Sequence, residues 1–133
     1  MRVAAGVLVK NPNDPSLFLS FKRKKSEGGG ASLPCGKSDE GEAPHQTAQR
    51  ECLEETGWTI FLHMLHPFVE YDEKDGYQVW IFSGDLDEEE YKVSPTFPDE
   101  GEVCWATAQD LIDGPYGEFN RLALAHFGII TTN

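Results

Sequence analysis

The chain has 133 residues, a length that suits one domain built around one hydrophobic core. Its 23 acidic side chains against 11 basic ones give a formal net charge of −12. That balance argues against a nucleic-acid polymer or an anionic membrane surface as a partner, because both attract basic proteins. An acidic chain can still bind phosphates when cations bridge the two.

The first third of the chain is expected to form strands. Residues 3–9, VAAGVLV, are a continuous apolar run typical of a buried strand, and the turn residues NPNDP follow. We interpret this run as a first strand and not as a signal peptide, because no cleavage site follows it. A second strand is expected over residues 17–23 and a short one over residues 32–34. No segment has transmembrane length, and the three cysteines lack zinc-ligand spacing, which favours reduced thiols and a cytoplasmic location.

A helix is expected over residues 44–56. Pro44 suits the first helical position, and Gly57 suits the position just past the end. Ala43 is a weak N-cap, because its side chain offers no hydrogen-bond acceptor.

The rest of the chain alternates strands with short helices. The pair Asp75-Gly76 signals a hairpin, and Thr107 with Asp110 signals a capped helix start. Strands are expected over residues 59–71, 77–86 and 102–106, and helices over residues 107–113 and 117–127. This order predicts one α/β (α+β) domain over residues 1–133, with a largely antiparallel or mixed sheet.

Three glutamates cluster on the predicted helix 44–56. At about 100° per residue, Glu55 lies about 40° from Glu51 and Glu54 about 60° to the other side, so all three project from one face. Neighbouring carboxylates destabilise a helix by a few tenths of a kcal/mol per pair, whereas a bound divalent cation reverses that sign. The three glutamates taken alone leave two readings open, a metal site and a solvated acidic face.

A near match to a phosphate-binding loop precedes this helix. Residues 31–38, ASLPCGKS, fit the pattern GxxxxGK[ST] except that Ala31 stands at its first glycine. The acidic, turn-like DEGEAP follows, whereas a true P-loop opens directly into its helix. We interpret the match as fortuitous.

Seven residues carry a far more specific pattern. The pattern is G, five residues, E, seven residues, RE, a hydrophobic residue, any residue, EE, any residue and G. The residues that match it are Gly36, Glu42, Arg50, Glu51, Glu54, Glu55 and Gly57. In this the chain resembles the Nudix hydrolases over residues 36–58, and more loosely over residues 17–23 and 100–112. Cys35 departs from the family pattern, which usually has glycine there, and Cys52 and Trp58 fill positions that are usually aliphatic.

The resemblance implies a Nudix fold, with a mixed sheet packed between helices, and a metal site. The implied activity is hydrolysis of a pyrophosphate bond in a nucleoside diphosphate linked to another group, with Mg²⁺ or Mn²⁺. The implied metal ligands are Glu51, Glu54, Glu55 and a backbone carbonyl at Gly36. Arg50 would orient a glutamate through charge-assisted hydrogen bonds. Glu42 and Gly57 would be structural supports.

The resemblance leaves the general base open between two regions. Glu51 is one candidate, and Asp99, Glu100 and Glu102 are the others, of which we prefer Glu100. A solvated acidic loop is the alternative interpretation of residues 99–102.

Three further residues are candidates for binding the substrate. Arg23 at the end of a strand and Lys37 beside the predicted metal loop would contact a phosphate or a base; surface cations are the plain alternative. Tyr71 would stack on a nucleobase, and its alternative is a cross-strand contact.

The sequence favours a substrate class by elimination. The residues that distinguish the ADP-ribose, dinucleoside polyphosphate, coenzyme A and NADH branches of the family are missing from their expected positions. Their absence favours a MutT-like hydrolase of nucleoside triphosphates, modified ones included. The alternatives are a dinucleoside polyphosphate or ADP-ribose/nucleotide-sugar pyrophosphatase, and a Nudix-fold module that binds nucleotides without catalysis. The expected partner is a small-molecule nucleotide bound to a monomer or a homodimer.

Overall fold

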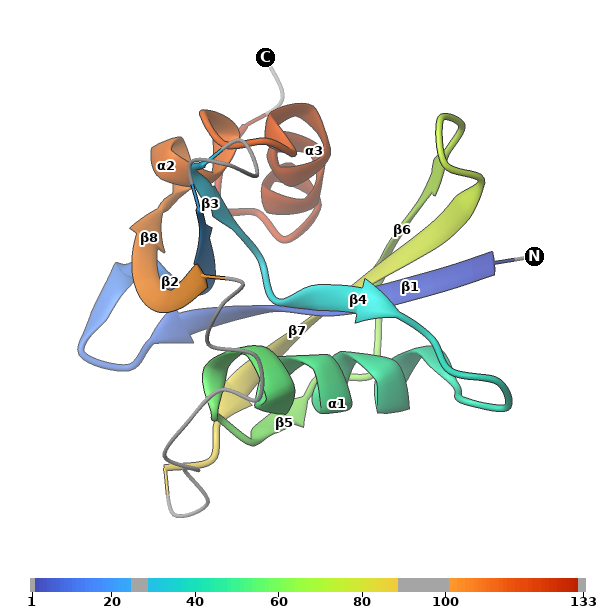
Figure 1. Cartoon of the computed structure of the whole chain (residues 1–133). Coiled ribbons are helices and arrows are strands. Elements are labelled where there is room, and N and C mark those ends of the chain that lie inside the picture. The colour runs from blue at the N-terminus through green and yellow to red at the C-terminus, as the bar shows by residue number, and fades with distance from the viewer. Residues whose placement is uncertain (1, 25–28, 89–100, 132–133) are drawn as a thin grey trace.

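Strands dominate the computed structural model, which describes residues 2–24, 29–88 and 101–131 (Figure 1). In chain order the elements are β1 (Arg2–Asn11), β2 (Asp14–Arg23), β3 (Ala31–Ser32), β4 (Cys35–Lys37), α1 (Pro44–Thr56), β5 (Ile60–Leu62), β6 (Phe68–Asp72), β7 (Tyr77–Leu86), β8 (Gly101–Thr107), α2 (Ala108–Ile112) and α3 (Gly117–His126). No helix of these residues is long and apolar enough to cross a membrane.

The sheet is mixed, as predicted. β1 runs parallel to β7 from the pair Arg2↔Tyr77 to the pair Val9↔Gly84. On its other side β1 pairs antiparallel with β4 and then, at its end, with β2. β2 pairs with β3 and β8, while β5 and β6 both pair with β7. The long β1–β7 pair therefore forms the spine from which the shorter strands extend.

Helices cover both faces of this spine. Ala5, Val7 and Val9 of β1 belong to the core cluster that includes residues of α1, whereas Leu8 belongs to the cluster shared with α2 and α3. Because successive strand residues point to opposite faces, these clusters lie on opposite sides of the sheet. Figure 1 shows the same arrangement, with α1 on one side of the strands and α2 and α3 on the other. The predicted sheet packed between helices is confirmed.

The predicted bounds of α1 match the structure. Gly57 has φ 80°, in the left-handed region that favours glycine, and its N–H donates to the Leu53 carbonyl at 2.9 Å. Ala43 makes no side-chain cap, as expected, but the Gln46 side chain accepts from the Ala43 N–H at 2.8 Å. That bond satisfies a donor next to the helix start, where Ala43 itself offers no acceptor.

Two strand predictions were wrong. Residues 59–71 are two strands, β5 and β6, because the chain turns between them at His66, which has φ 60° and precedes Pro67. The short strand expected over residues 32–34 ends at Ser32, because β3 is Ala31–Ser32, and Leu33 and Pro34 lie between β3 and β4. The predicted hairpin is confirmed, since Asp72 pairs with Tyr77 across a turn that ends at Gly76, φ 74°.

Candidate functional site

The segment from β4 to α1 brings Gly36 against the glutamates of the helix. β4 pairs with β1 through Ala5↔Gly36, and α1 packs beside both strands. A Cβ atom added to Gly36 would lie 2.1 Å from the carboxyl carbon of Glu51. Only glycine therefore leaves room for the Glu51 carboxylate where it lies. The same contact brings the β4 backbone next to a carboxylate, as the predicted metal loop requires.

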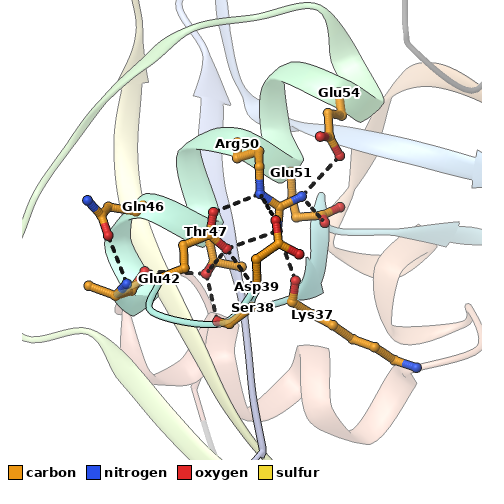
Figure 2. A network of polar contacts seen from close by, with 10 residues as sticks. Lys37, Ser38, Asp39, Glu42, Gln46, Thr47, Arg50, Glu51 and Glu54 are labelled. Carbon is orange, nitrogen blue, oxygen red and sulfur yellow. Dashed lines mark hydrogen bonds and ion pairs between the residues drawn. The ribbon is translucent and has the colours of Figure 1, made fainter.

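Arg50 compensates the charge of the clustered glutamates (Figure 2). Its Nη1 donates to Glu51 Oε1 at 2.8 Å and to Glu54 Oε2 at 3.2 Å. Two carboxylates that would repel each other thus converge on one guanidinium nitrogen. The positive charge of Arg50 explains why these carboxylates can cluster. The clustering brings two hard oxygen donors to one place.

Glu42 holds the other edge of the Arg50 guanidinium. Its Oε2 accepts from Nε at 2.8 Å and its Oε1 from Nη2 at 3.0 Å, a bidentate pair. The same Oε1 accepts from the Thr47 hydroxyl at 2.7 Å and from the Asp39 N–H at 2.9 Å. Arg50 Nη2 also donates to the Lys37 carbonyl at 2.9 Å. Arg50 is therefore fixed from the loop as well as from its own helix.

These bonds lower the pKa of Glu42. The hydrogen bonds from Arg50 are the largest cause, and the pKa falls to about 2. A carboxylate whose pKa is lowered by folding stabilises the fold above its unfolded pKa of about 4.3, and that contribution is lost as the pH falls towards 2. Glu42 is thus expected to support the site in its ionised form throughout the neutral range.

We expect Glu42→Gln to lower the free energy of unfolding at pH 7 by about 1 to 3 kcal/mol, because Arg50 loses a partly buried, charged acceptor. Urea unfolding at several pH values measures this difference between the two proteins, which should shrink between pH 5 and pH 2. Glu118→Gln is the matched control. It breaks the ion pair Glu118–Arg121 at 2.6 Å, whose carboxylate is 72% exposed, and should change stability far less than Glu42→Gln does. A difference that does not vary with pH would contradict the assignment.

Glu51 and Glu55 are both partly buried. The Glu51 side chain is 16% exposed, and burial raises its pKa against the opposing effect of Arg50. Glu55 Oε1 accepts from the Cys35 N–H at 2.9 Å. Burial, with the charges of Glu55 and Glu51, raises the pKa of the Cys35 thiol to about 12, so this cysteine adds no negative charge at neutral pH. Cys35 lies in an ordinary strand, and its backbone positions a predicted metal ligand.

The donor set fits a hard divalent cation. Glu51, Glu54 and Glu55 offer carboxylate oxygens from one face of α1, and the main chain at Gly36 lies against Glu51. In the part of the chain that the structure describes, no group of three His, Cys, Asp or Glu side chains converges closely enough to hold an ion. Arg50 supplies the positive charge between Glu51 and Glu54 instead. The metal ligands stay a prediction.

The predicted substrate-binding residues lie in three separate places. Arg23 ends β2, with its guanidinium 5.5 Å from the Tyr116 ring centroid, and its Nε is buried with no hydrogen-bond partner among the described residues. Lys37 ends β4, beside the Arg50 network, with its side chain directed away from it (Figure 2). Tyr71 is 52% exposed on β6, at an edge of the sheet. The three roles stay predictions.

Glu100, the preferred base, lies outside the described residues, as does Asp99. Glu102 lies on β8 opposite Lys22 of β2, and its side chain is exposed. The structure thus describes one of the three acids of the second candidate region, and the general base stays open.

Sequence reasoning missed the residues that hold the loop to the helix. The buried Thr47 bonds to Glu42 and shares a short 2.6 Å hydrogen bond with the Ser38 hydroxyl. Asp39 adds a longer contact to Arg50 Nε at 3.5 Å. Thr47 precedes Arg50 by three residues, and that helical spacing is a signal that could have placed both side chains on one face.

The fold and the arrangement of Gly36, Arg50 and the glutamates define a class of protein. Residues 1–127 match the model of the NUDIX domain family. The chain therefore belongs to the Nudix family, and the hydrolase class predicted from residues 36–58 is confirmed with it.

Solved structures share the fold at low sequence identity. A NUDIX hydrolase from Nitrosomonas europaea is 18% identical, with 96% of this chain and 89% of that chain covered and a TM-score of 0.64. A MutT structure described for Aliivibrio salmonicida and Vibrio cholerae is 20% identical, covers 97% and 98%, and has a TM-score of 0.69. A MutT NUDIX hydrolase from Burkholderia pseudomallei is 24% identical, covers 94% and 96%, and also has a TM-score of 0.69. A search of the curated proteins found no match.

Proposed function

We propose that the chain hydrolyses a pyrophosphate bond in a nucleoside diphosphate derivative, with Mg²⁺ or Mn²⁺ as cofactor. The observation that carries the proposal is that the carboxylates of Glu51 and Glu54 converge on Arg50 Nη1, with Glu51 lying against Gly36. Membership of the Nudix family supports it. Water adds to a phosphorus atom, the bridging P–O bond breaks, and the proton of the water passes to a carboxylate.

The proposed metal ligands are Glu51, Glu54, Glu55 and the main chain at Gly36. A divalent cation bound there neutralises phosphate charge and lowers the pKa of bound water. The chain's own contribution is to bring hard oxygens together on α1 and to fix them through Arg50 and Glu42. Gly57 ends the helix immediately after these ligands.

The proposed general base is Glu51 or an acid of residues 99–102. The raised pKa of Glu51 favours it, because a base works best when its pKa approaches the working pH. We expect glutamine at the true base to lower kcat by about 10²- to 10⁴-fold and to remove the acidic limb of the pH–rate profile. Glu51→Gln and Glu100→Gln, measured side by side, show which residue it is. An acidic limb that persists in both variants would exclude both.

The proposed substrate is a nucleoside triphosphate, modified ones included, which yields the monophosphate and pyrophosphate. The likeness of the fold to two MutT structures supports this class. Arg23, Lys37 and Tyr71 are the proposed contacts to it. We further propose a single domain, active as a monomer or homodimer in the cytoplasm, with no membrane or nucleic-acid polymer as partner.

A panel of nucleotides tests the proposal directly. Nucleoside triphosphates, dinucleoside polyphosphates, ADP-ribose and nucleotide sugars are incubated with the chain in Mg²⁺, in Mn²⁺ or in EDTA, and the products are resolved by chromatography. We expect a nucleoside triphosphate to be hydrolysed best, with a divalent ion only. Turnover of a different nucleotide would favour the other pyrophosphatase classes. Tight nucleotide binding without turnover would favour a non-catalytic module.

A further inference from the structure

An open hollow lies between the start of the β1–β7 pair and the loop that leads into α1. Its volume is about 420 Å³, and the residues that matter to its chemistry are Arg2, Lys37, Asp39, Glu40, Glu42 and Tyr77. Three of its charged residues are acidic and two are basic. The kind of ligand that the hollow can bind therefore depends on which of these charges are already paired within the chain.

Two cationic groups converge on one aromatic ring in this hollow. The Arg2 guanidinium carbon is 4.4 Å and the Lys37 Nζ 5.5 Å from the centroid of the Tyr77 ring. Both distances are within the range of cation–π attraction. Arg2 Nη2 also donates to the Asp75 carbonyl, which fixes the guanidinium from a second side. The ring and the carbonyl hold these cations in place before any ligand arrives, which lowers the ordering cost of binding.

Neither cation is neutralised by an acidic side chain of the residues that the structure describes. Within residues 2–24, 29–88 and 101–131, no carboxylate lies within ion-pairing distance of Arg2 or Lys37. Of the three acids of the hollow, Glu42 is bonded by Arg50 and Asp39 lies 3.5 Å from Arg50 Nε, whereas the exposed Glu40 pairs with no base among the described residues. Among the described residues, the hollow therefore keeps two uncompensated cations against one uncompensated acid, a balance that favours an anionic ligand.

The hollow adjoins the proposed reaction site through direct contacts. Lys37 lines the hollow, and its carbonyl accepts from Arg50 Nη2 at 2.9 Å. Arg50 Nη1 in turn contacts Glu51 at 2.8 Å. Figure 2 shows the Lys37 side chain extending away from this network. The hollow therefore borders the same loop that Arg50 ties to the glutamates of α1.

We propose that this hollow binds the phosphate groups of the substrate that lie beyond the scissile bond. Arg2 and Lys37 donate to the phosphate oxygens, and Tyr77 positions both cations. The ligand class is a pyrophosphate group, either as the end of a nucleoside triphosphate or as the free product. The inference rests on the proposed function for the identity of the substrate but not for the binding of pyrophosphate itself.

Binding of inorganic pyrophosphate, measured by calorimetry on the full chain in EDTA, tests the hollow without catalysis. We expect Arg2→Gln to weaken binding about tenfold, the effect of one lost charge-assisted hydrogen bond, and Arg2→Lys to restore part of it. Lys10→Gln is the matched control, because it removes one exposed cation from the other end of β1. It should leave the dissociation constant within about twofold of the wild-type value.

Steady-state kinetics distinguish whether the hollow binds the end of the substrate or only the free pyrophosphate product. If the hollow holds the end of the substrate, Arg2→Gln raises KM for a nucleoside triphosphate about tenfold and raises KM for the diphosphate, which has only one phosphate beyond the scissile bond, by a smaller factor. If it holds only the product, pyrophosphate inhibition weakens and both KM values stay unchanged. Equal pyrophosphate binding by wild type, Arg2→Gln and Lys10→Gln overturns the inference, even if hydrolysis is found. If Arg2→Gln does not fold, Tyr77→Leu replaces it and is expected to weaken pyrophosphate binding in the same direction; unchanged binding overturns the inference again.

Discussion

Replacing Glu54 and Glu55 together by glutamine is expected to lower kcat/KM by about 10³-fold or more. The reason is the loss of two anionic oxygen donors from the proposed metal site, where a cation supplies several kcal/mol of transition-state stabilisation. Glutamine keeps the shape of each side chain, so α1 retains its packing. Steady-state hydrolysis of the best substrate from the nucleotide panel, with circular dichroism as a check of folding, measures the effect.

A charge-matched variant separates this effect from the general loss of negative charge. Glu70→Gln with Glu73→Gln also removes two carboxylates, both from exposed positions on or next to β6. Its kcat/KM should stay within about twofold of the wild-type value. Hydrolysis that survives in the double variant of Glu54 and Glu55 would exclude the metal site proposed on α1.

Gly36→Ala is expected to abolish most activity and to leave the chain folded. The added Cβ would lie 2.1 Å from the Glu51 carboxyl carbon, and that carboxylate is the end of a flexible side chain that can turn aside. The backbone therefore accommodates the added Cβ at little cost in stability, because the Glu51 side chain moves out of its position. A displacement of about 1 Å at a reacting group lowers the rate about 10²-fold, so kcat/KM should fall by at least that factor.

Gly6→Ala is the contrasting substitution on the strand opposite. Its Cβ would lie 2.2 Å from the Pro34 carbonyl oxygen and 2.7 Å from the Cys35 Cβ. Backbone atoms cannot turn aside, so we expect a loss of about 1 to 3 kcal/mol in the free energy of unfolding. Thermal unfolding of both variants distinguishes the two mechanisms. A Gly36→Ala protein that is as active as wild type would contradict the placement of Glu51.

Local chemistry explains which elements could be predicted from the sequence. Pro44 and Gly57 fix the ends of α1, and Thr107 and Asp110 form the reciprocal cap of α2 that their spacing predicts. The hairpin at Gly76 follows from the same kind of signal, a residue suited to positive φ. Each of these signals acts within a few residues, so tertiary packing does not override it.

The missed features depend on contacts between distant segments. Pro67 is a local signal for the break near His66, but nothing in residues 59–71 shows that both resulting strands pair with β7. The spacing of the glutamates predicted one face of a helix, but not that Arg50 would lie between Glu51 and Glu54. The convergence of Arg2 and Lys37 on Tyr77 joins three strands, β1, β4 and β7, and has no local signal.

Equilibrium binding of Mn²⁺, followed by electron paramagnetic resonance, tests the metal site without any choice of substrate. The wild-type chain should bind Mn²⁺ at a site that the double variant of Glu54 and Glu55 lacks, while the double variant of Glu70 and Glu73 binds as wild type does. Gly36→Ala should bind the ion more weakly, because Glu51 is displaced. Equal Mn²⁺ binding by all four proteins would contradict the assignment of the site to residues 36–58.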